Sequence, residues 1–317
     1  MTSPVWVVGA RGLLGTGLVD QLTRSGAWEV IDAAPLPWAS GTTADFDSTV
    51  EANLDLIGAT GADHVVIAWC AGAAVTGSTI AQLTAEQEQL LRVLDLVERR
   101  GWASGTLFYA SSAGGVYAGS ANPPFTELTT PRPISPYGDF KLSTERAVTA
   151  FAQRTGWSAL CGRISNLYGP GQSMTKAQGL ITQLARAEVT GEPASLYVSL
   201  DTIRDYIFAD DCAAMIADTL AHLATSGVAG ETTVKIFASE QPATIAALIG
   251  TFRVLFKART HILLGASSSS GFQARDLRFR SVVLPEISRR DLMPLPAGIT
   301  RTAEAVSRWL QNGRKAS

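Results

Sequence analysis

The feature that most constrains the fold is the segment VWVVGARGLLG, residues 5–15. It predicts a buried strand, then a turn with glycines three residues apart, then the start of a helix. Gly9 permits a tight turn, Gly12 lets the backbone approach a pyrophosphate, and Gly15 lets the helix pack on the strand. The segment therefore predicts a dinucleotide-binding βαβ unit at the N-terminus.

Charged groups beside this turn indicate which dinucleotide it binds. The amides of Leu13 and Leu14, at the start of the helix, are expected to bind phosphate oxygens. Asp32 ends the second predicted strand, where an acidic residue binds the adenosine ribose. A carboxylate there repels a 2'-phosphate, which favours NAD over NADP. Arg11 is either a partner for a 2'-phosphate or a solvated loop residue.

Short β-branched or aromatic runs alternate with longer amphipathic runs in the first half of the chain. This alternation predicts an α/β fold with a doubly wound parallel sheet of the Rossmann type and helices on both faces. The predicted strands are residues 5–8, 28–32, 64–69, 106–110 and 158–163, and the predicted helices are residues 12–25, 84–100 and 136–155.

The pattern loosens after Tyr168, where Gly-Pro-Gly interrupts the order of elements. We expect a strand leading into a helix at residues 201–211, a strand at 234–238, a polar loop at 267–270 and a closing helix at 301–310. We assign residues 1–167 and 205–238 to a Rossmann domain. Residues 168–204 and 239–317 are assigned to a smaller C-terminal α/β subdomain that binds the substrate.

Composition excludes several partners. With 26 basic and 28 acidic side chains, the chain gives no reason to expect nucleic acid or an anionic membrane surface as a partner. It has no apolar stretch long enough to span a bilayer and no basic signal region at its start. Cys70, Cys161 and Cys212 are far apart, which indicates free thiols in a reducing, cytoplasmic compartment and no metal site.

Tyr137 and Lys141 lie four residues apart in the run SPYGDFK, residues 135–141. Side chains at this spacing share one face of a helix. A nearby ammonium favours the phenolate, so the lysine is expected to lower the pKa of the tyrosine. The pair is therefore predicted to move a proton on or off a sugar or alcohol hydroxyl.

With three further motifs, these residues resemble the extended branch of the short-chain dehydrogenase/reductase superfamily. Within it, they resemble the nucleotide-sugar epimerase/dehydratase family typified by UDP-galactose 4-epimerase. The motifs are SSAGGVY at 111–117, RISNLYGPG at 163–171 and RDYIFADD at 204–211. Their order and spacing match over nearly the whole chain, and the C-terminal part matches loosely.

The resemblance implies roles for residues around a bound NAD. Tyr137 is expected to be the catalytic acid/base, and Lys141 to bind the nicotinamide ribose. Further positions expected to line the cofactor are Asp45 and Phe46, beside the adenine, and Ala68, Trp69 and Ala71 along a neighbouring strand.

The resemblance also implies two contacts with a nucleotide-sugar substrate. Asn166 stands where the family contacts the substrate, and its alternative role is to cap a turn. Arg204 stands where the family contacts the diphosphate or the nucleotide, which suits a guanidinium fork. Its alternative is a surface ion pair with Asp205 or Asp210.

The chain departs from the family beside its catalytic strand. The family places Ser or Thr where this chain has Ala113, and that hydroxyl binds the reacting oxygen. A shifted turn through Gly114 and Gly115 would let Ser112 replace it, as a catalytic and substrate-binding hydroxyl; alternatively Ser111 and Ser112 satisfy the strand end. Dehydratases of the family carry Asp-Glu at the two glycines and related decarboxylases a glutamate at the second, which argues against both activities.

These features predict an NAD-dependent nucleotide-sugar epimerase that acts through a transient keto-sugar. An NAD(P)H-dependent nucleotide-4-ketosugar reductase would use the same residues, and a non-catalytic dinucleotide sensor is a minor alternative. Residues 84–89 offer Glu and Gln where the family commonly has an asparagine. The helices that start at Thr84 and Pro136 are the pair that the family buries in a homodimer, unless they merely cover their own sheet.

Overall fold

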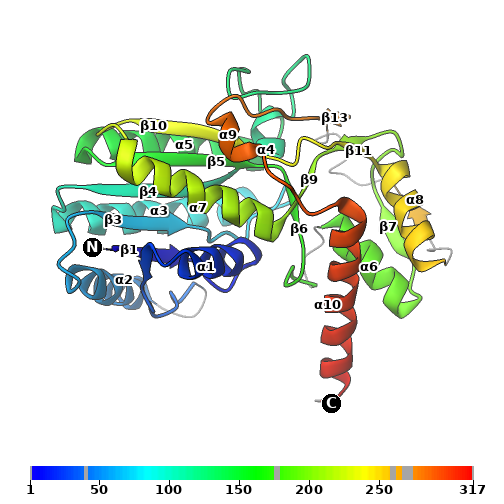
Figure 1. Cartoon of the computed structure of the whole chain (residues 1–317), viewed down its shortest axis with the longest axis horizontal. Helices are drawn as coiled ribbons and strands as arrows, with labels where there is room; N and C mark the ends of the chain where they lie inside the picture. Colours follow the sequence, from blue (N-terminus) through cyan, green and yellow to red (C-terminus); the bar gives the residue numbers. More distant parts are fainter. Residues whose placement is uncertain (1, 39–41, 175–178, 258–261, 266–273, 316–317) are drawn as a thin grey trace.

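The computed structural model describes residues 2–38, 42–174, 179–257, 262–265 and 274–315 (Figure 1). Its centre is a six-stranded sheet in the order β10-β5-β4-β3-β1-β2, with every neighbouring pair parallel. The strands are β1 (Ser3–Val8), β2 (Trp28–Val30), β3 (Val65–Trp69), β4 (Gly105–Ser112), β5 (Ser158–Ile164) and β10 (Thr232–Phe237). The predicted Rossmann-type sheet is confirmed.

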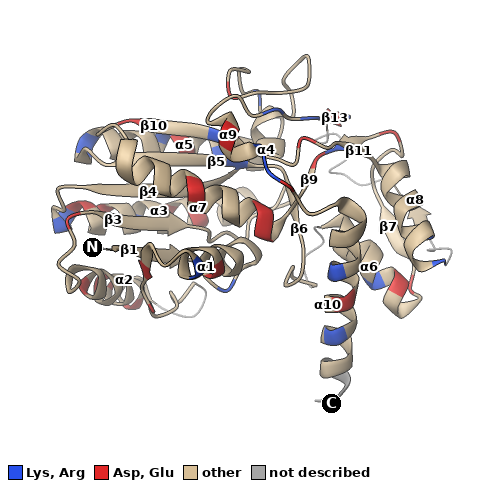
Figure 2. Ribbon diagram, in the orientation of Figure 1, with Lys and Arg blue, Asp and Glu red and all other residues tan. Residues whose placement is uncertain are grey.

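Helices cover both faces of this sheet because its strands are apolar on both sides. Val5 and Val7 of β1 pack toward α1 (Leu13–Ser25) and α7 (Ala209–Ser226). Trp6 and Val8 point to the opposite face. That face is covered by α2 (Thr43–Gly58), α3 (Ile80–Arg100) and α5 (Pro136–Thr155). Figure 2 shows that β1, β3 and β4 carry no charged residues, as expected of strands buried between two layers.

Local capping chemistry explains where the sequence prediction missed helix boundaries. Thr79 and Gln82 form a capping box, so α3 begins at Ile80 and the predicted start at residue 84 was wrong. A second capping box, between Thr42 and Asp45, begins α2, a helix that the sequence analysis did not predict. β2 ends at Val30 rather than at residue 32.

The order of the strands fixes where a ligand can bind. β1 lies between β2 and β3, so the chain turns in opposite directions on its two sides. Open α/β sheets bind ligands at this point, beyond the carboxyl ends of the strands. The turn after β1 and the loop after β3 meet there. A Cβ on Gly9 would lie 2.7 Å from the Cα and N atoms of Ala71.

A second core lies beside the sheet and combines residues from the later elements, including Tyr168, Leu184, Phe252 and Ile299. In Figure 1, α6 and α10 stand side by side there, away from the central strands. The elements outside the sheet and its covering helices are α4 (Ala113–Tyr117), β6 (Asn166–Tyr168), α6 (Leu180–Thr190), β7 (Ala194–Leu196), β8 (Ile203–Arg204), β9 (Tyr206–Phe208), β11 (Ala243–Thr244), α8 (Ile245–Phe256), β12 (Ile262–Leu264), β13 (Asp276–Leu277), α9 (Pro285–Ser288) and α10 (Leu295–Lys315).

Two of the C-terminal predictions can be compared with these elements, and a third cannot. In place of the single strand expected before α7, the chain forms two short strands, β8 and β9, which belong to different sheets. β8 pairs with β11 and β13, and β9 pairs with β6. The closing helix α10 is longer than the predicted residues 301–310. The predicted polar loop at 267–270 lies outside the described residues. Within the described ranges, no helix is long and apolar enough to cross a membrane.

Candidate active site

The turn after β1 leaves room for a phosphate group because three glycines pack against backbone. Gly9 has a φ of +86°, which glycine adopts without strain. A Cβ on Gly15 would lie 2.1 Å from the carbonyl oxygen of Gly9, so no other residue fits there without moving the turn. Gly12 caps α1 without a side-chain hydrogen bond, which leaves the amides of Leu13 and Leu14 open to a ligand. The turn therefore fits the pyrophosphate of a dinucleotide.

Two exposed charged residues stand near this turn. Asp32 follows β2 by two residues and lies at the same edge of the sheet as the glycine turn, where it is exposed. Arg11 is exposed within the turn itself. Neither side chain belongs to the core, and both are available to a ligand at the carboxyl edge.

Other predicted cofactor positions have structural roles of their own. The Asp45 carboxylate accepts hydrogen bonds from the backbone N and the hydroxyl of Thr42, and these bonds lower its pKa. Phe46 is 5 % exposed and packs edge-to-face against Trp38. Ala68 and Trp69 are buried inside β3. Because Phe46, Ala68 and Trp69 are buried, only their backbone atoms could contact a bound cofactor. Ala71 is half-buried beside Gly9.

Tyr137 and Lys141 occupy the first turns of α5, whose start the sequence dictates. Ser135 caps the helix by accepting a hydrogen bond of 3.2 Å from the backbone N of Gly138, and Pro136 occupies the first helical position. The Lys141 Nζ lies 5.7 Å from the centroid of the Tyr137 ring. Nζ also donates to the carbonyl oxygen of Ala110 at 3.2 Å, which fixes the ammonium against β4.

Ser112 reaches Tyr137 from the end of β4. Its hydroxyl caps α4 by accepting a hydrogen bond of 3.1 Å from the backbone N of Gly115, and its side chain lies near enough to Tyr137 to lower the pKa of the phenol. A Cβ on Gly115 would lie 3.1 Å from Cε1 of Tyr137 and 3.3 Å from Oγ of Ser112. Glycine at this position therefore allows the serine and the tyrosine to approach, while Ala113 is buried and points away from solvent.

The pKa of Tyr137 departs from the sequence-based expectation. The pKa is raised to about 12: burial raises it most, interaction with the Ser112 side chain lowers it, and the negative charge of Glu86 raises it. The prediction of a net lowered pKa was wrong for this structure, because the loss of solvation around the phenol outweighs the favourable contacts. Tyr137 is therefore protonated at neutral pH.

A buried polar network behind the site was missed by the sequence analysis. Glu145 accepts hydrogen bonds from the Ser111 hydroxyl at 2.6 Å and from Nη2 of Arg163 at 2.6 Å. Arg163 also donates to the hydroxyl of Tyr117 at 2.5 Å. Glu145 follows Lys141 by four residues on the same face of α5, which is the signal that could have found it. The network ties α5 to β4 and β5 beside Ser112.

Asn166 and Arg204 lie where the sheet meets the second core. The Asn166 Nδ2 donates to the carbonyl oxygen of Asp205 at 2.8 Å. Arg204 is 8 % exposed, and its Nη1 donates to the carbonyl oxygen of Ile203 at 2.9 Å. Burial lowers the pKa of Arg204, and the charges of Tyr206 and Asp276 oppose this effect. The alternative of a surface ion pair is wrong, because the arginine is buried.

The cysteines belong to the packing of the protein rather than to the site. Cys161 and Cys212 are buried, Cys70 is half-buried, and all three are free thiols. Burial raises the pKa of each thiol, so they carry no charge at neutral pH. In the part of the chain that the structure describes, no group of three or more His, Cys, Asp or Glu side chains is arranged to hold a metal ion.

The fold and the site define a dinucleotide-binding α/β protein with a Tyr–Lys pair at the carboxyl edge of its sheet. The family model described as "NAD dependent epimerase/dehydratase family" matches residues 5–234, and the chain belongs to this family. The family resemblance proposed from the motifs is thereby confirmed.

Curated relatives match over shorter stretches. The chain is 32% identical over 129 residues to dTDP-L-rhamnose 4-epimerase of Burkholderia thailandensis, which covers 38% of this chain and 36% of the relative. It is 33% identical over 105 residues to dTDP-4-dehydro-6-deoxyglucose reductase of Escherichia coli, which covers 33% of each chain. The chain thus matches about a third of the length of these relatives.

A solved structure resembles the whole chain. The UDP-glucose 4-epimerase of Thermus thermophilus, in complex with NAD, superposes with a TM-score of 0.78 over 96% of this chain and 98% of that one. The identity is 20%, so the likeness is one of fold.

Proposed function

We propose that this protein is an NAD-dependent nucleotide-sugar epimerase that acts through a transient keto-sugar. The observation that carries the proposal is the meeting of Tyr137, Lys141 and Ser112 at the edge of the sheet that also carries the glycine turn. Gly114 and Gly115 leave this site without the acid pair that elimination of water requires. Hydride and proton transfer without elimination is the chemistry that remains.

The residues of the site divide the proton chemistry among them. When bound, oxidised NAD supplies a hydride acceptor and a positive charge that favours the phenolate. Tyr137 takes the proton of the sugar hydroxyl and returns it when the keto-sugar is reduced. The Ser112 hydroxyl, which stands beside Tyr137, orients the sugar oxygen. Lys141, held by the carbonyl oxygen of Ala110, stabilises the phenolate form of Tyr137 before it accepts the proton and after it returns it.

The test of this assignment is Tyr137→Phe. We expect turnover of nucleotide sugars to fall by a factor of at least about 10², within the usual range for loss of an acid/base, while NAD binding is retained. Ser112→Ala should reduce turnover less, because the phenol remains. Full activity of Tyr137→Phe would exclude the proposed role of the tyrosine, and an unchanged rate for Ser112→Ala would exclude that of the serine.

NAD rather than NADP is the proposed cofactor because of Asp32. Its exposed carboxylate just after β2 would repel a 2'-phosphate. Isothermal titration calorimetry should therefore give a lower Kd for NAD than for NADP, and Asp32→Asn should narrow the difference. A preference of the native protein for NADP would contradict this part of the proposal and would point to Arg11 instead.

A keto-sugar reductase is the second candidate, and the protonated state of Tyr137 favours it. A reductase needs a tyrosine that holds a proton for the carbonyl oxygen, and a pKa raised to about 12 keeps the phenol protonated at neutral pH. The two functions differ in stoichiometry. An epimerase interconverts UDP- or dTDP-sugars with catalytic NAD and no net change in NADH absorbance, whereas a reductase consumes one NADH for each keto-sugar reduced.

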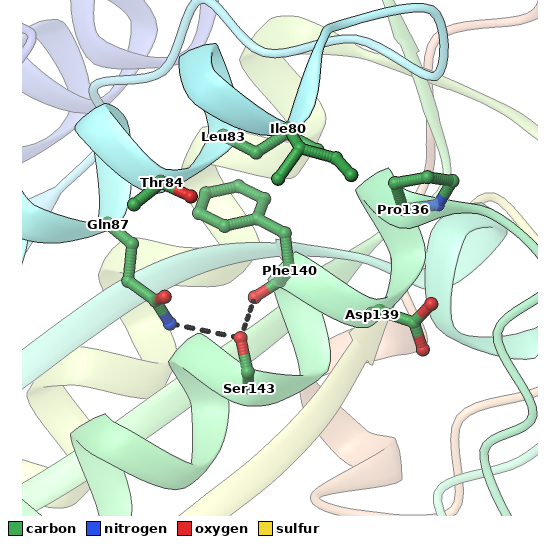
Figure 3. A pocket seen from close by; sticks show the side chains of 8 residues that line it. All are labelled: Ile80, Leu83, Thr84, Gln87, Pro136, Asp139, Phe140 and Ser143. Carbon is green, nitrogen blue, oxygen red and sulfur yellow. Dashed lines mark hydrogen bonds between the residues drawn. The ribbon is translucent and has the colours of Figure 1, made fainter.

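We also propose that α3 and α5 form the contact of a homodimer. A hollow of about 410 Å³ lies between these two helices and is lined by Ile80, Leu83, Thr84, Gln87, Pro136, Asp139, Phe140 and Ser143 (Figure 3). Ile80 at its rim is 71 % exposed, and Leu91 on the same helix is 38 % exposed. Light scattering after gel filtration should give twice the chain mass, and Ile80→Asp should shift it toward the monomer. A monomeric native protein would contradict the proposal.

A further inference from the structure

Glu86 is an acidic residue of α3 that has no role in the proposed mechanism. Its Oε2 accepts hydrogen bonds from the backbone N of Ala73 at 2.8 Å and from that of Ala74 at 2.9 Å. A Cβ on Gly72 would lie 3.0 Å from Oε1, so the loop after β3 approaches the carboxylate closely. Glu86 thus holds the backbone of residues 72–74, directly after Ala71.

The position of this loop connects Glu86 with the cofactor turn. Ala71 packs against Gly9, the first glycine of the turn, within the distance at which a side chain on Gly9 would collide. The loop therefore lies against the glycine turn beyond the carboxyl ends of β1 and β3. Two amide hydrogen bonds to a single carboxylate fix this loop from the side of α3.

Glu86 also acts on the tyrosine across the site. Its negative charge raises the pKa of Tyr137, after the larger effect of burial. The other groups that face the tyrosine are the Ser112 hydroxyl, the Lys141 ammonium at 5.7 Å from the ring centroid, and Tyr109 of β4, whose ring lies 5.1 Å from the same ammonium. A carboxylate among these groups disfavours a second negative charge on the phenol.

We propose that Glu86 is a positioning residue of this site, which clamps the β3–α3 loop beside the glycine turn and adds a negative charge on the side of Tyr137 that faces α3. The inference rests on the proposed role of Tyr137 as the acid/base. It explains how the chain uses a charged residue in the helix segment 84–89, where the family commonly has a neutral asparagine. Before Tyr137 can accept the proton of the sugar hydroxyl it must lose its own, and that loss then depends on positive charge, including that of Lys141.

Glu86→Gln separates the charge from the clamp, because a glutamine oxygen accepts the same two hydrogen bonds. Glu88→Gln is the matched control, since Glu88 lies on the same helix and is exposed. The titration of Tyr137 is followed by the absorbance of its phenolate. The absorbance of the same protein with Tyr137→Phe is subtracted, so that the other tyrosines cancel. We expect the midpoint of Glu86→Gln to fall by a few tenths of a pH unit or more, and that of Glu88→Gln to stay. A native midpoint in Glu86→Gln overturns the charge role.

Glu86→Ala tests the clamp. Without the acceptor, hydrogen exchange at the amides of Ala73 and Ala74 should accelerate at least tenfold, and the Kd for NAD should rise. Glu86→Gln should retain protection close to native. Unchanged exchange in Glu86→Ala overturns the clamp. None of these measurements depends on turnover. Their outcome is therefore separate from the activity of Tyr137→Phe, which tests the proposed function itself.

Discussion

The buried ion pair between Glu145 and Arg163 allows a direct test of how much it stabilises the fold beside the active site. Both side chains are almost fully buried, at 6 % and 7 % exposure, and Nη2 of Arg163 lies 2.6 Å from Oε2 of Glu145. Glu145→Ala would leave the arginine charged in the core and would remove the partner of the Ser111 hydroxyl. Breaking a buried pair in this way costs about 3–5 kcal/mol. We therefore expect the free energy of unfolding to fall by about that amount.

The assay is urea unfolding followed by tryptophan fluorescence, because Trp6, Trp69 and Trp157 lie in the same core cluster as part of α5. The matched control is the ion pair between Glu98 and Arg154, which joins α3 to α5 at 2.9 Å but is 37 % and 52 % exposed. Glu98→Ala should cost less than about 1 kcal/mol, as exposed pairs generally do.

A double variant distinguishes charge from packing. In Glu145→Met with Arg163→Met, no unpaired charge remains in the core, so the protein should be more stable than Glu145→Ala alone. Equal losses for Glu145→Ala and Glu98→Ala would refute the reasoning, since burial would then make no difference to the value of an ion pair.

Two further predictions concern the glycine turn and the titration of Tyr137. Gly15→Ala should lower the melting temperature and weaken NAD binding at least tenfold, because its Cβ would lie 2.1 Å from the Gly9 oxygen; Gly12→Ala, with 3.3 Å to the same atom, should melt close to native. The pKa of Tyr137 is raised from 10.0 to about 12, so the folded protein keeps a proton that the unfolded chain loses. The stability from this group is present in full below pH 10, its unfolded value, and is lost as the pH rises through about 12. Alkaline unfolding of Tyr137→Phe should lack this part of the decline, and an identical profile would contradict the assignment.

Much of the sheet was predictable because the apolar residues of each strand already indicate that the strand is buried. The runs that became β1, β3, β4 and β5 are mostly apolar and are buried on both faces, a pattern that parallel strands require and that depends little on neighbours. The helices α1 and α5 were predictable for a related reason, since a glycine turn and a Ser-Pro start mark them locally. The start of α3 and all of α2 were missed, although their capping boxes are written in the sequence.

The second core was predicted poorly because its short strands depend on distant partners. β8 has two residues and exists through its pairing with β11 and β13, which lie far along the chain. Strand propensity over two residues carries no signal of such pairing. Arg204, at the end of β8, is buried for the same reason, and its neighbours in sequence alone were equally consistent with a solvent-exposed ion pair.

By itself, the sequence determined the family, the parallel sheet and the identity of the Tyr–Lys pair, because glycine spacing and helical spacing are local properties of the backbone. The tertiary structure decided how that pair is tuned. Whether Tyr137 loses its proton easily depends on burial, on Ser112 and on the charge of Glu86. These groups come from three separate segments of the chain, and solvation and Coulomb energy depend on their distances in space rather than on their positions in sequence.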